Sequence, residues 1–184
     1  MDEDILMQRV AEGDMQAFRR LVTAYQPRLL RFARRMLPED RTFAEDVVQE
    51  AFVRLWRARG RYRPEGRLGR FLLRIVHNLC LDAVRDAPPA LSLETAEDLP
   101  AAGGSLHQQA DAGALATAVR RAVQELPELQ RSVFVLSYYE GLSYAEIARM
   151  LECPVGTVAS RKRLAVAALR RRLGGWNEGG DEQR

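Results

Sequence analysis

The stretch from residue 88 to residue 113, PPALSLETAEDLPAAGGSLHQQADAG, constrains the fold of this 184-residue chain more than any other. It has no sustained helical or strand period, and it is rich in proline, glycine, alanine and acidic residues, as interdomain linkers are. A structureless loop of this length is uncommon inside a compact domain. We therefore expect two domains, at 1–87 and 114–174, joined by a flexible acidic linker and followed by a flexible tail at 175–184.

The charge of the chain follows the same division. The linker contains no lysine or arginine, whereas basic residues outnumber acidic ones in both flanking blocks. Every cationic side chain except Lys162 is an arginine, whose planar guanidinium binds phosphate and base edges with two hydrogen bonds. Two basic bodies joined by an acidic strip indicate a protein that faces a polyanion.

The N-terminal block has helical periodicity throughout. The expected helices are 14–26, 27–37, 46–59 and 70–86. Asp14 is the expected N-cap of the first, and Pro27 is expected to end that helix and begin the second. Thr42 and Glu45 form a capping-box pattern ahead of the third. This block is therefore expected to be a helical bundle.

The C-terminal block is expected to be helical as well, so the fold class is all-α. Its expected helices are 114–125, 127–139, 144–151 and 155–173. Ser143 and Glu146 form a capping box before the third, and small Ala148 lets the last two helices cross closely, which predicts a helix-turn-helix. The final helix has many cations and no acid, which favours DNA binding over an ordinary helical hairpin with a solvated basic face.

Several function classes have no support in the sequence. Cys80, Cys153, His77 and His107 have no zinc-site spacing, so no metal is expected, and the cysteines are interpreted as small apolar residues. No P-loop, nucleophile elbow or other catalytic motif is present, so we expect no catalytic residues, no enzyme activity and no cofactor. No apolar run approaches the roughly 20 residues that span a bilayer, and no secretion signal is evident, so we expect a cytoplasmic protein without membrane insertion.

Three segments resemble the extracytoplasmic-function (ECF) sigma factors, the small members of the sigma-70 family. LPELQRSVFVLSYYEGLSYAEIARMLECPVGTVASR resembles their C-terminal domain, which binds the promoter −35 element. AEDVVQEAFVRLW resembles the helix that docks on the clamp helices of RNA polymerase, and LGRFLLRIVHNLCLDAVR resembles the segment that opens and reads the −10 element. The resemblance covers about residues 10–86 and 114–173 and implies a sigma factor with these two domains.

The first implied surface is a polymerase-docking face. Its residues fall at helical spacings of three and four and therefore share one side of a helix. They are Asp46, Gln49, Glu50, Val53 and Trp56. Without the resemblance, the apolar residues of this helix would be interpreted as core and the acidic ones as solvated; with it, Trp56 is interpreted as an anchor against the polymerase.

The second implied surface binds the −10 element. Arginines interleaved with aromatic residues suit single-stranded DNA, because cations follow the backbone and aromatic rings stack on bases. The expected contacts are Arg61, Tyr62, Arg63, Arg67, Arg70, Phe71, Arg74 and Asn78. Asn78 matches an asparagine of the family, with a solvated amide as the alternative. The chain departs from the family pattern at Phe71, where tryptophan is usual, and at His77, where arginine is common.

The third implied surface is the last helix of the helix-turn-helix. The residues expected to contact the −35 element are Thr157, Ser160, Arg161, Lys162 and Arg163. Ala159, Leu164 and Val166 stand where relatives often have basic residues. These replacements indicate either an altered −35 preference or a surface shared with a protein.

The sequence therefore predicts a sigma factor that recruits RNA polymerase core to particular promoters. The resemblance implies as partners the β′ clamp helices and β flap of the core, promoter DNA, and an anti-sigma factor. The alternative is a helix-turn-helix regulator with an N-terminal protein-interaction domain that does not dock on polymerase. The docking helix and its arginine–aromatic loop favour the sigma factor, because such a regulator has no need of them.

Overall fold

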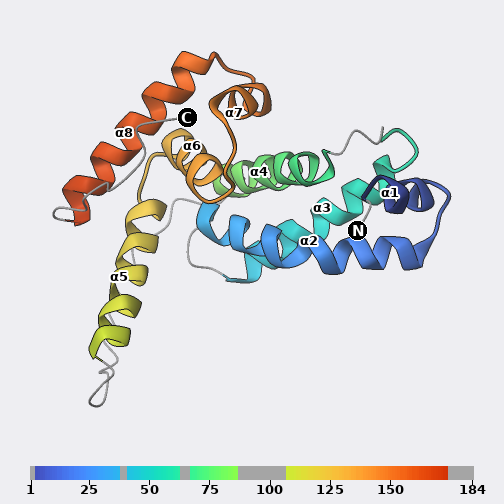
Figure 1. The fold of residues 1–184 in the computed structure, drawn as a ribbon, viewed down its shortest axis with the longest axis horizontal. Coiled ribbons are helices and arrows are strands. Elements are labelled where there is room, and N and C mark those ends of the chain that lie inside the picture. Colours follow the sequence, from blue (N-terminus) through green and yellow to red (C-terminus); the bar gives the residue numbers. More distant parts are fainter. Residues whose placement is uncertain (1–2, 38–40, 63–66, 87–106, 174–184) are drawn as a thin grey trace. The chain divides into compact units, whose positions relative to one another are not determined.

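The computed structural model describes residues 3–37, 41–62, 67–86 and 107–173, and divides the chain into two compact units at Pro88. Every regular element in these ranges is an α-helix, so the expected all-α fold is confirmed (Figure 1). The first unit contains α1 Glu3–Ala11, α2 Met15–Met36, α3 Arg41–Ala58 and α4 Leu68–Asp86. The second contains α5 His107–Gln124, α6 Glu128–Tyr138, α7 Tyr144–Met150 and α8 Val155–Leu173.

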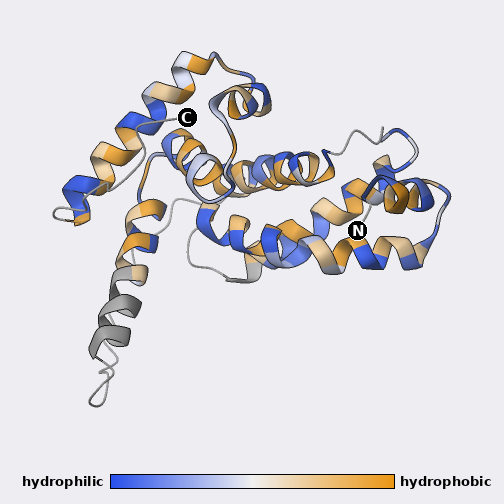
Figure 2. Ribbon diagram, in the orientation of Figure 1, coloured by the Kyte–Doolittle hydropathy of each residue, from blue (hydrophilic) through white to orange (hydrophobic). Residues whose placement is uncertain are grey.

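The long helix α2 forms the centre of the first unit and packs against α1, α3 and α4. Asp14 caps it as expected, because its carboxylate accepts hydrogen bonds from the backbone N–H groups of Gln16 and Ala17 at 2.8 and 3.1 Å. The buried face includes Leu21, Leu29 and Phe32, each fully inaccessible to solvent. Orange hydrophobic residues recur along α2, alternating with blue hydrophilic ones, as expected of a helix with one buried side (Figure 2).

The expectation that Pro27 separates two helices is wrong. Pro27 lies inside α2, which continues from Met15 to Met36. A proline in a helix interior costs about 3 kcal/mol, since it removes one backbone hydrogen bond and crowds the preceding turn. Leu21 before the proline and Leu29 after it are both fully buried on the same face, so core packing on both sides holds the helix together.

Helices α3 and α4 complete the first core. Ala51 and Leu55 of α3, and Leu72 and Val76 of α4, are fully buried. At Gly69 the start of α4 comes so close to α2 that an added Cβ would lie 3.3 Å from the Tyr25 ring. The first unit therefore holds the outer sides of α3 and α4 in fixed positions on one bundle.

In the second unit, α8 packs on α5, α6 and α7. Val158, Ala165 and Leu169 form its buried side, and Phe134 of α6 and Ile147 of α7 are buried with them. Arg172 Nε lies 3.2 Å from Glu125 Oε2 in an exposed ion pair. The apolar spacing of α8 therefore fixes which side of this helix faces the core and which faces outward.

The helix-turn-helix expected in the second unit is present as α7 and α8, with its local signals in place. Ser143 and Glu146 form the capping box in front of α7: the Ser143 N–H donates to the Glu146 carboxylate at 2.8 Å. After α7, Glu152 adopts φ 51°, and the Cys153 N–H donates to the Ala148 carbonyl at 3.0 Å. A left-handed residue followed by this bond is the Schellman ending of a helix, and it turns the chain sharply into α8.

Helices α3 and α5 begin five or more residues earlier than expected. Helix α3 begins at Arg41, so Thr42 lies within the helix and is not its N-cap. Helix α5 begins at His107, inside the segment expected to be linker, because its alternating alanines favour a helix by more than Gly113 disfavours it. Residues 87–106 and the tail from 174 lie outside the described residues.

Candidate functional site

The first surface, here called the α3 face, consists of Asp46, Gln49, Glu50 and Val53. Asp46, Gln49 and Val53 are exposed and Glu50 is half-buried, so the structure brings these four expected residues together on the outside of the first unit. Val53 has 40% of its surface exposed, which is unusual for a valine in a packed helix. Arg54 Nε donates to Glu50 Oε1 at 2.9 Å, which partly neutralises that carboxylate.

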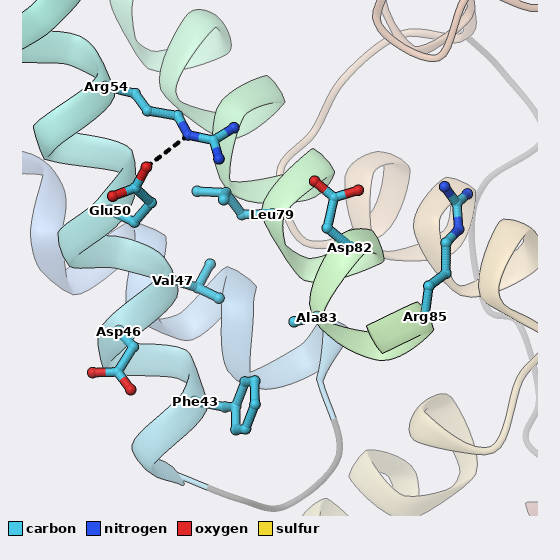
Figure 3. A pocket seen from close by; sticks show the side chains of 9 residues that line it. All are labelled: Phe43, Asp46, Val47, Glu50, Arg54, Leu79, Asp82, Ala83 and Arg85. Carbon is cyan, nitrogen blue, oxygen red and sulfur yellow. Dashed lines mark hydrogen bonds and ion pairs between the residues drawn. The ribbon is translucent and has the colours of Figure 1, made fainter. Parts of the chain in front are cut away.

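Two shallow grooves flank the α3 face. The groove between α3 and α4 is lined by Phe43, Asp46, Val47, Glu50, Arg54, Leu79, Asp82, Ala83 and Arg85 (Figure 3). The groove between α2 and α3 is lined by Val22, Gln26, Leu30, Glu45, Val48, Gln49, Phe52 and Val53. Each groove has an apolar floor and polar edges, a composition that suits a protein partner.

Phe43 belongs to the α3 face in space, although the sequence analysis did not select it. Its ring is 48% exposed and stands at the end of the α3–α4 groove beside Asp46 (Figure 3). The spacing of three residues to Asp46 was the signal that could have identified it, since such residues share a helix side. We include Phe43 in the α3 face from here on.

Trp56 lies apart from the α3 face in its contacts. It is half-buried, and its ring centroid is 5.0 Å from that of Phe18 on α2. The Arg59 guanidinium lies 4.3 Å from the Trp56 ring centroid, and Arg59 Nη1 donates to the Trp56 carbonyl at 2.8 Å. These contacts tie the end of α3 to α2.

The second surface, here called the α4 stripe, consists of Arg67, Arg70, Arg74 and Asn78. All four residues are exposed. Arg67 directly precedes α4, and spacings of four keep Arg70, Arg74 and Asn78 on one side of that helix. Arg61, shortly after the end of α3, is exposed as well. Arg63 lies outside the described residues.

Tyr62 and Phe71 stand together beside the α4 stripe. Their ring centroids are 5.4 Å apart, and both residues are half-buried. The structure therefore brings the two expected aromatic residues into contact with each other. Neither residue is fully buried, so each keeps part of its surface accessible.

Asn78 has a buried neighbour that influences its amide. His77 is only 3% exposed, and its Nδ1 lies 3.3 Å from Asn78 Oδ1. His77 stands where arginine is common in the sigma factors that the sequence resembles. Its imidazole fits inside the first core, where an arginine would bring a charge.

The third surface is the outer side of α8. Of the five expected residues, Arg163 is exposed, and Thr157, Ser160, Arg161 and Lys162 are half-buried. Three of the half-buried residues are engaged within the second unit. Ser160 Oγ donates to the Thr157 carbonyl at 3.0 Å, Arg161 Nη1 lies 3.9 Å from Cys153 Sγ, and Lys162 Nζ lies 5.4 Å from the centroid of the Tyr144 ring.

The three apolar departures on α8 are accessible to different degrees. Ala159 and Leu164 are exposed, Leu164 by 52%, and Val166 is half-buried. Val155, at the first position of the helix, is 49% exposed. The N-terminal end of α8 therefore exposes more apolar surface than its many cationic residues suggest.

Among the described residues of the first unit, Tyr25 and Asp14 have shifted pKa values. Burial and the nearby Glu3 carboxylate raise the pKa of Tyr25, so its hydroxyl stays neutral against α4. Backbone hydrogen bonds from Ala17 and the Arg9 side chain lower the pKa of Asp14 below 3.8, so this cap remains charged at neutral pH.

No cluster of metal-ligating side chains occurs within the described ranges, and none of their helices is long and apolar enough to cross a membrane. Cys80 is buried in the first unit and Cys153 is half-buried in the turn before α8. These positions give the two cysteines different surroundings.

Each of the two units matches a known protein family. Residues 21–88 match Sigma-70 region 2, and residues 116–169 match Sigma-70 region 4. The RNA polymerase sigma-H factor of Pseudomonas aeruginosa is 36% identical over 167 residues, which cover 85% of this chain and 86% of that protein. The ECF RNA polymerase sigma-E factor of Escherichia coli K12 is 34% identical over 171 residues, which cover 88% of each chain.

A solved structure of CnrH in complex with the cytosolic domain of CnrY is similar to this chain with a TM-score of 0.66 and 29% sequence identity, covering 94% of this chain and 97% of that one. These matches extend across the helices that carry all three surfaces. The chain therefore belongs to the sigma-70 family of RNA polymerase sigma factors, in its extracytoplasmic-function group.

Proposed function

We propose that this sigma factor divides promoter-directed initiation among its three surfaces. The α3 face docks on the polymerase core, the α4 stripe holds the −10 element, and the outer side of α8 contacts the −35 element. The observation that carries this division is the separation of chemistry: the α3 face is acidic and apolar, whereas the outer sides of α4 and α8 carry arginines. Apolar and acidic surface suits a protein partner, and arginine rows suit nucleic acid.

Docking through the α3 face would place Phe43 and Val53 against the partner as apolar contacts, with the carboxylates at their edges. Both side chains are about half exposed in the chain alone, so their burial would add to affinity. We assign Trp56 a supporting part in this step, because its ring contacts Phe18 and Arg59. Trp56 would then support docking indirectly, by holding the C-terminal end of α3 against α2.

Opening the −10 element requires that the protein compensate for unstacked bases, at a cost of a few kcal/mol for each base. Arg67, Arg70 and Arg74 would follow the backbone of one strand, and the accessible parts of Tyr62 and Phe71 would stack on bases. Asn78 would contribute a hydrogen bond to a base edge. No covalent step is involved, so we propose a non-enzymatic role in the cytoplasm, where the polymerase acts.

An anti-sigma factor is the further partner that we propose. The solved complex at 29% identity pairs its sigma-like chain with the cytosolic domain of a second protein. The grooves on either side of the α3 face have the apolar floors that such a domain would need. A partner bound there would compete with the polymerase core for the same side chains.

The division of labour can be tested with two variants of the full chain. Gln49→Ala with Val53→Ala removes exposed side chains from the α3 face, and Arg163→Ala removes a cation from α8. We expect the first to lower affinity for purified core polymerase without changing binding to duplex −35 DNA, and the second to do the reverse. Equal losses in both assays for both variants would contradict the division.

A further inference from the structure

The first turns of α8 expose apolar side chains where a helix-turn-helix protein reads base edges. Side chains at the N-terminal end of the second helix enter the major groove. Val155 and Ala159 are exposed there, Val155 by 49%, and they share one side of the helix at a spacing of four. Within the described second unit, this strip is on the outside and is continued by exposed Arg163.

The polar residues of the same turns are directed to contacts within the protein. The Ser160 hydroxyl donates to the Thr157 carbonyl at 3.0 Å. Arg161 lies against Cys153 and Lys162 lies over the Tyr144 ring, on the two flanks of the helix. Arg163 is thus the exposed hydrogen-bonding side chain in line with Val155 and Ala159.

From this arrangement we propose that α8 reads the −35 element mainly through thymine methyl groups, which pack against Val155 and Ala159, while Arg163 supplies the hydrogen-bonding base contact. The inference rests on the proposed role of α8 at the −35 element, and it names the residues that set the sequence preference. Thymine displays its 5-methyl group in the major groove, where alanine and other apolar side chains discriminate it by contact. Arg163, one turn further along, fits the O6 and N7 acceptors of guanine.

The surrounding arginines have a separate part in this arrangement. Arg170 and Arg171 are exposed near the end of α8 and provide phosphate contacts that carry no sequence information. Affinity then comes from charge, whereas preference comes from the apolar strip. In this arrangement, a helix with apolar residues at positions that are often basic in relatives would still distinguish between DNA sequences.

Leu164 provides a matched control on the same helix. It is exposed by 52%, as Val155 is by 49%, but it lies about 140° around the helix from Ala159 and about 180° from Val155. Truncating Leu164 removes similar apolar surface without touching the strip. Val155→Ala is expected to fold, because alanine is the strongest helix former and the side chain is exposed.

The test uses holoenzyme made from the full chain and core polymerase, with a promoter first selected from a library. Each thymine of the −35 element is replaced in turn by deoxyuridine, which lacks only the methyl group. We expect about fourfold weaker binding at one or two positions, the value for one buried methyl-sized group. Val155→Ala should reduce that thymine–uracil difference to less than twofold, whereas Leu164→Ala should leave it unchanged.

The outcomes separate the inference from the function on which it rests. If uracil is tolerated at every −35 position while Arg163→Ala still weakens −35 binding, the methyl contact is refuted and the −35 role of α8 stands. If neither uracil nor Arg163→Ala changes binding, the proposed role of α8 is overturned as well. The proposal is also refuted if Leu164→Ala abolishes the thymine–uracil difference in binding and Val155→Ala preserves it. The methyl contact would then lie on the side of α8 that carries Leu164.

Discussion

Replacement of Trp56 by alanine should damage the fold of the first unit and leave the docking chemistry of the α3 face in place. The Trp56 ring is half-buried against Phe18, with ring centroids 5.0 Å apart, and the Arg59 guanidinium lies 4.3 Å from its centre. A fully buried tryptophan costs about 3–5 kcal/mol when truncated, and half of that applies here. The aromatic pair adds about 0.5–1.5 kcal/mol and the exposed cation–π contact about 0.5–1 kcal/mol.

The expected loss in the free energy of unfolding is therefore about 2.5–5 kcal/mol. For a unit of this size it corresponds to a fall in Tm of about 10–40 °C. Thermal unfolding of the full chain, followed by circular dichroism, measures this change. Trp56→Phe is the matched variant, because it keeps an aromatic ring against Phe18 and should lose much less.

Val53→Ala provides the opposite pattern. Its side chain is exposed on the α3 face, so stability should change by less than about 0.5 kcal/mol. If Val53 is a central docking contact, affinity for core polymerase should fall by about fivefold or more. The reasoning fails if Trp56→Ala unfolds at the wild-type temperature and weakens core binding as much as Val53→Ala does, because Trp56 would then be the docking contact.

Three further predictions follow from single contacts. Arg74→Ala should weaken binding of the holoenzyme to the single-stranded −10 element. The slope of log affinity against log salt concentration should become shallower by about 0.7 per lost phosphate contact, and an unchanged slope would show that Arg74 contacts no phosphate. Glu152→Gly should raise the free energy of unfolding of the second unit by about 0.5–1 kcal/mol, measured in urea, because glycine adopts the observed φ of 51° without strain; a loss of stability would contradict that turn geometry. Asp14→Ala should destabilise the chain at neutral pH, and the difference from wild type should disappear as the pH falls through the lowered pKa of Asp14, since protonation removes the charged cap; a difference that persists in acid would show that the carboxylate charge is not involved.

Local sequence signals predicted the helix-turn-helix closely. The expected start of the last helix at residue 155 and its end at residue 173 are those of α8, and the capping box of Ser143 and Glu146 is formed. Such signals succeed because a cap is decided by residues three apart, whose hydrogen bonds form within one turn. The fold class and the family could be predicted for the same reason, since the motifs are contiguous.

Long-range packing decided the features that the sequence did not predict. Pro27 has a strong local preference to begin a helix, yet the buried residues on both sides of it hold α2 as one helix. Trp56 shares a helix with the α3 face, but its ring is covered by Phe18, a residue far away in the sequence. Arg161 and Lys162 stay predicted −35 contacts; what the local sequence did not indicate is that Arg161 lies 3.9 Å from Cys153 and Lys162 lies 5.4 Å from the Tyr144 ring centroid.

Run-off transcription with purified core polymerase, the full chain and a promoter library tests the central claim most directly. The account predicts promoter-specific transcripts that require the chain, that are lost with Gln49→Ala and Val53→Ala together, and that change their −35 preference with Val155→Ala. Leu164→Ala should support the same transcripts as the wild type. If the chain binds duplex DNA but directs no specific transcript on any member of the library, the account of a promoter-selecting sigma factor is contradicted.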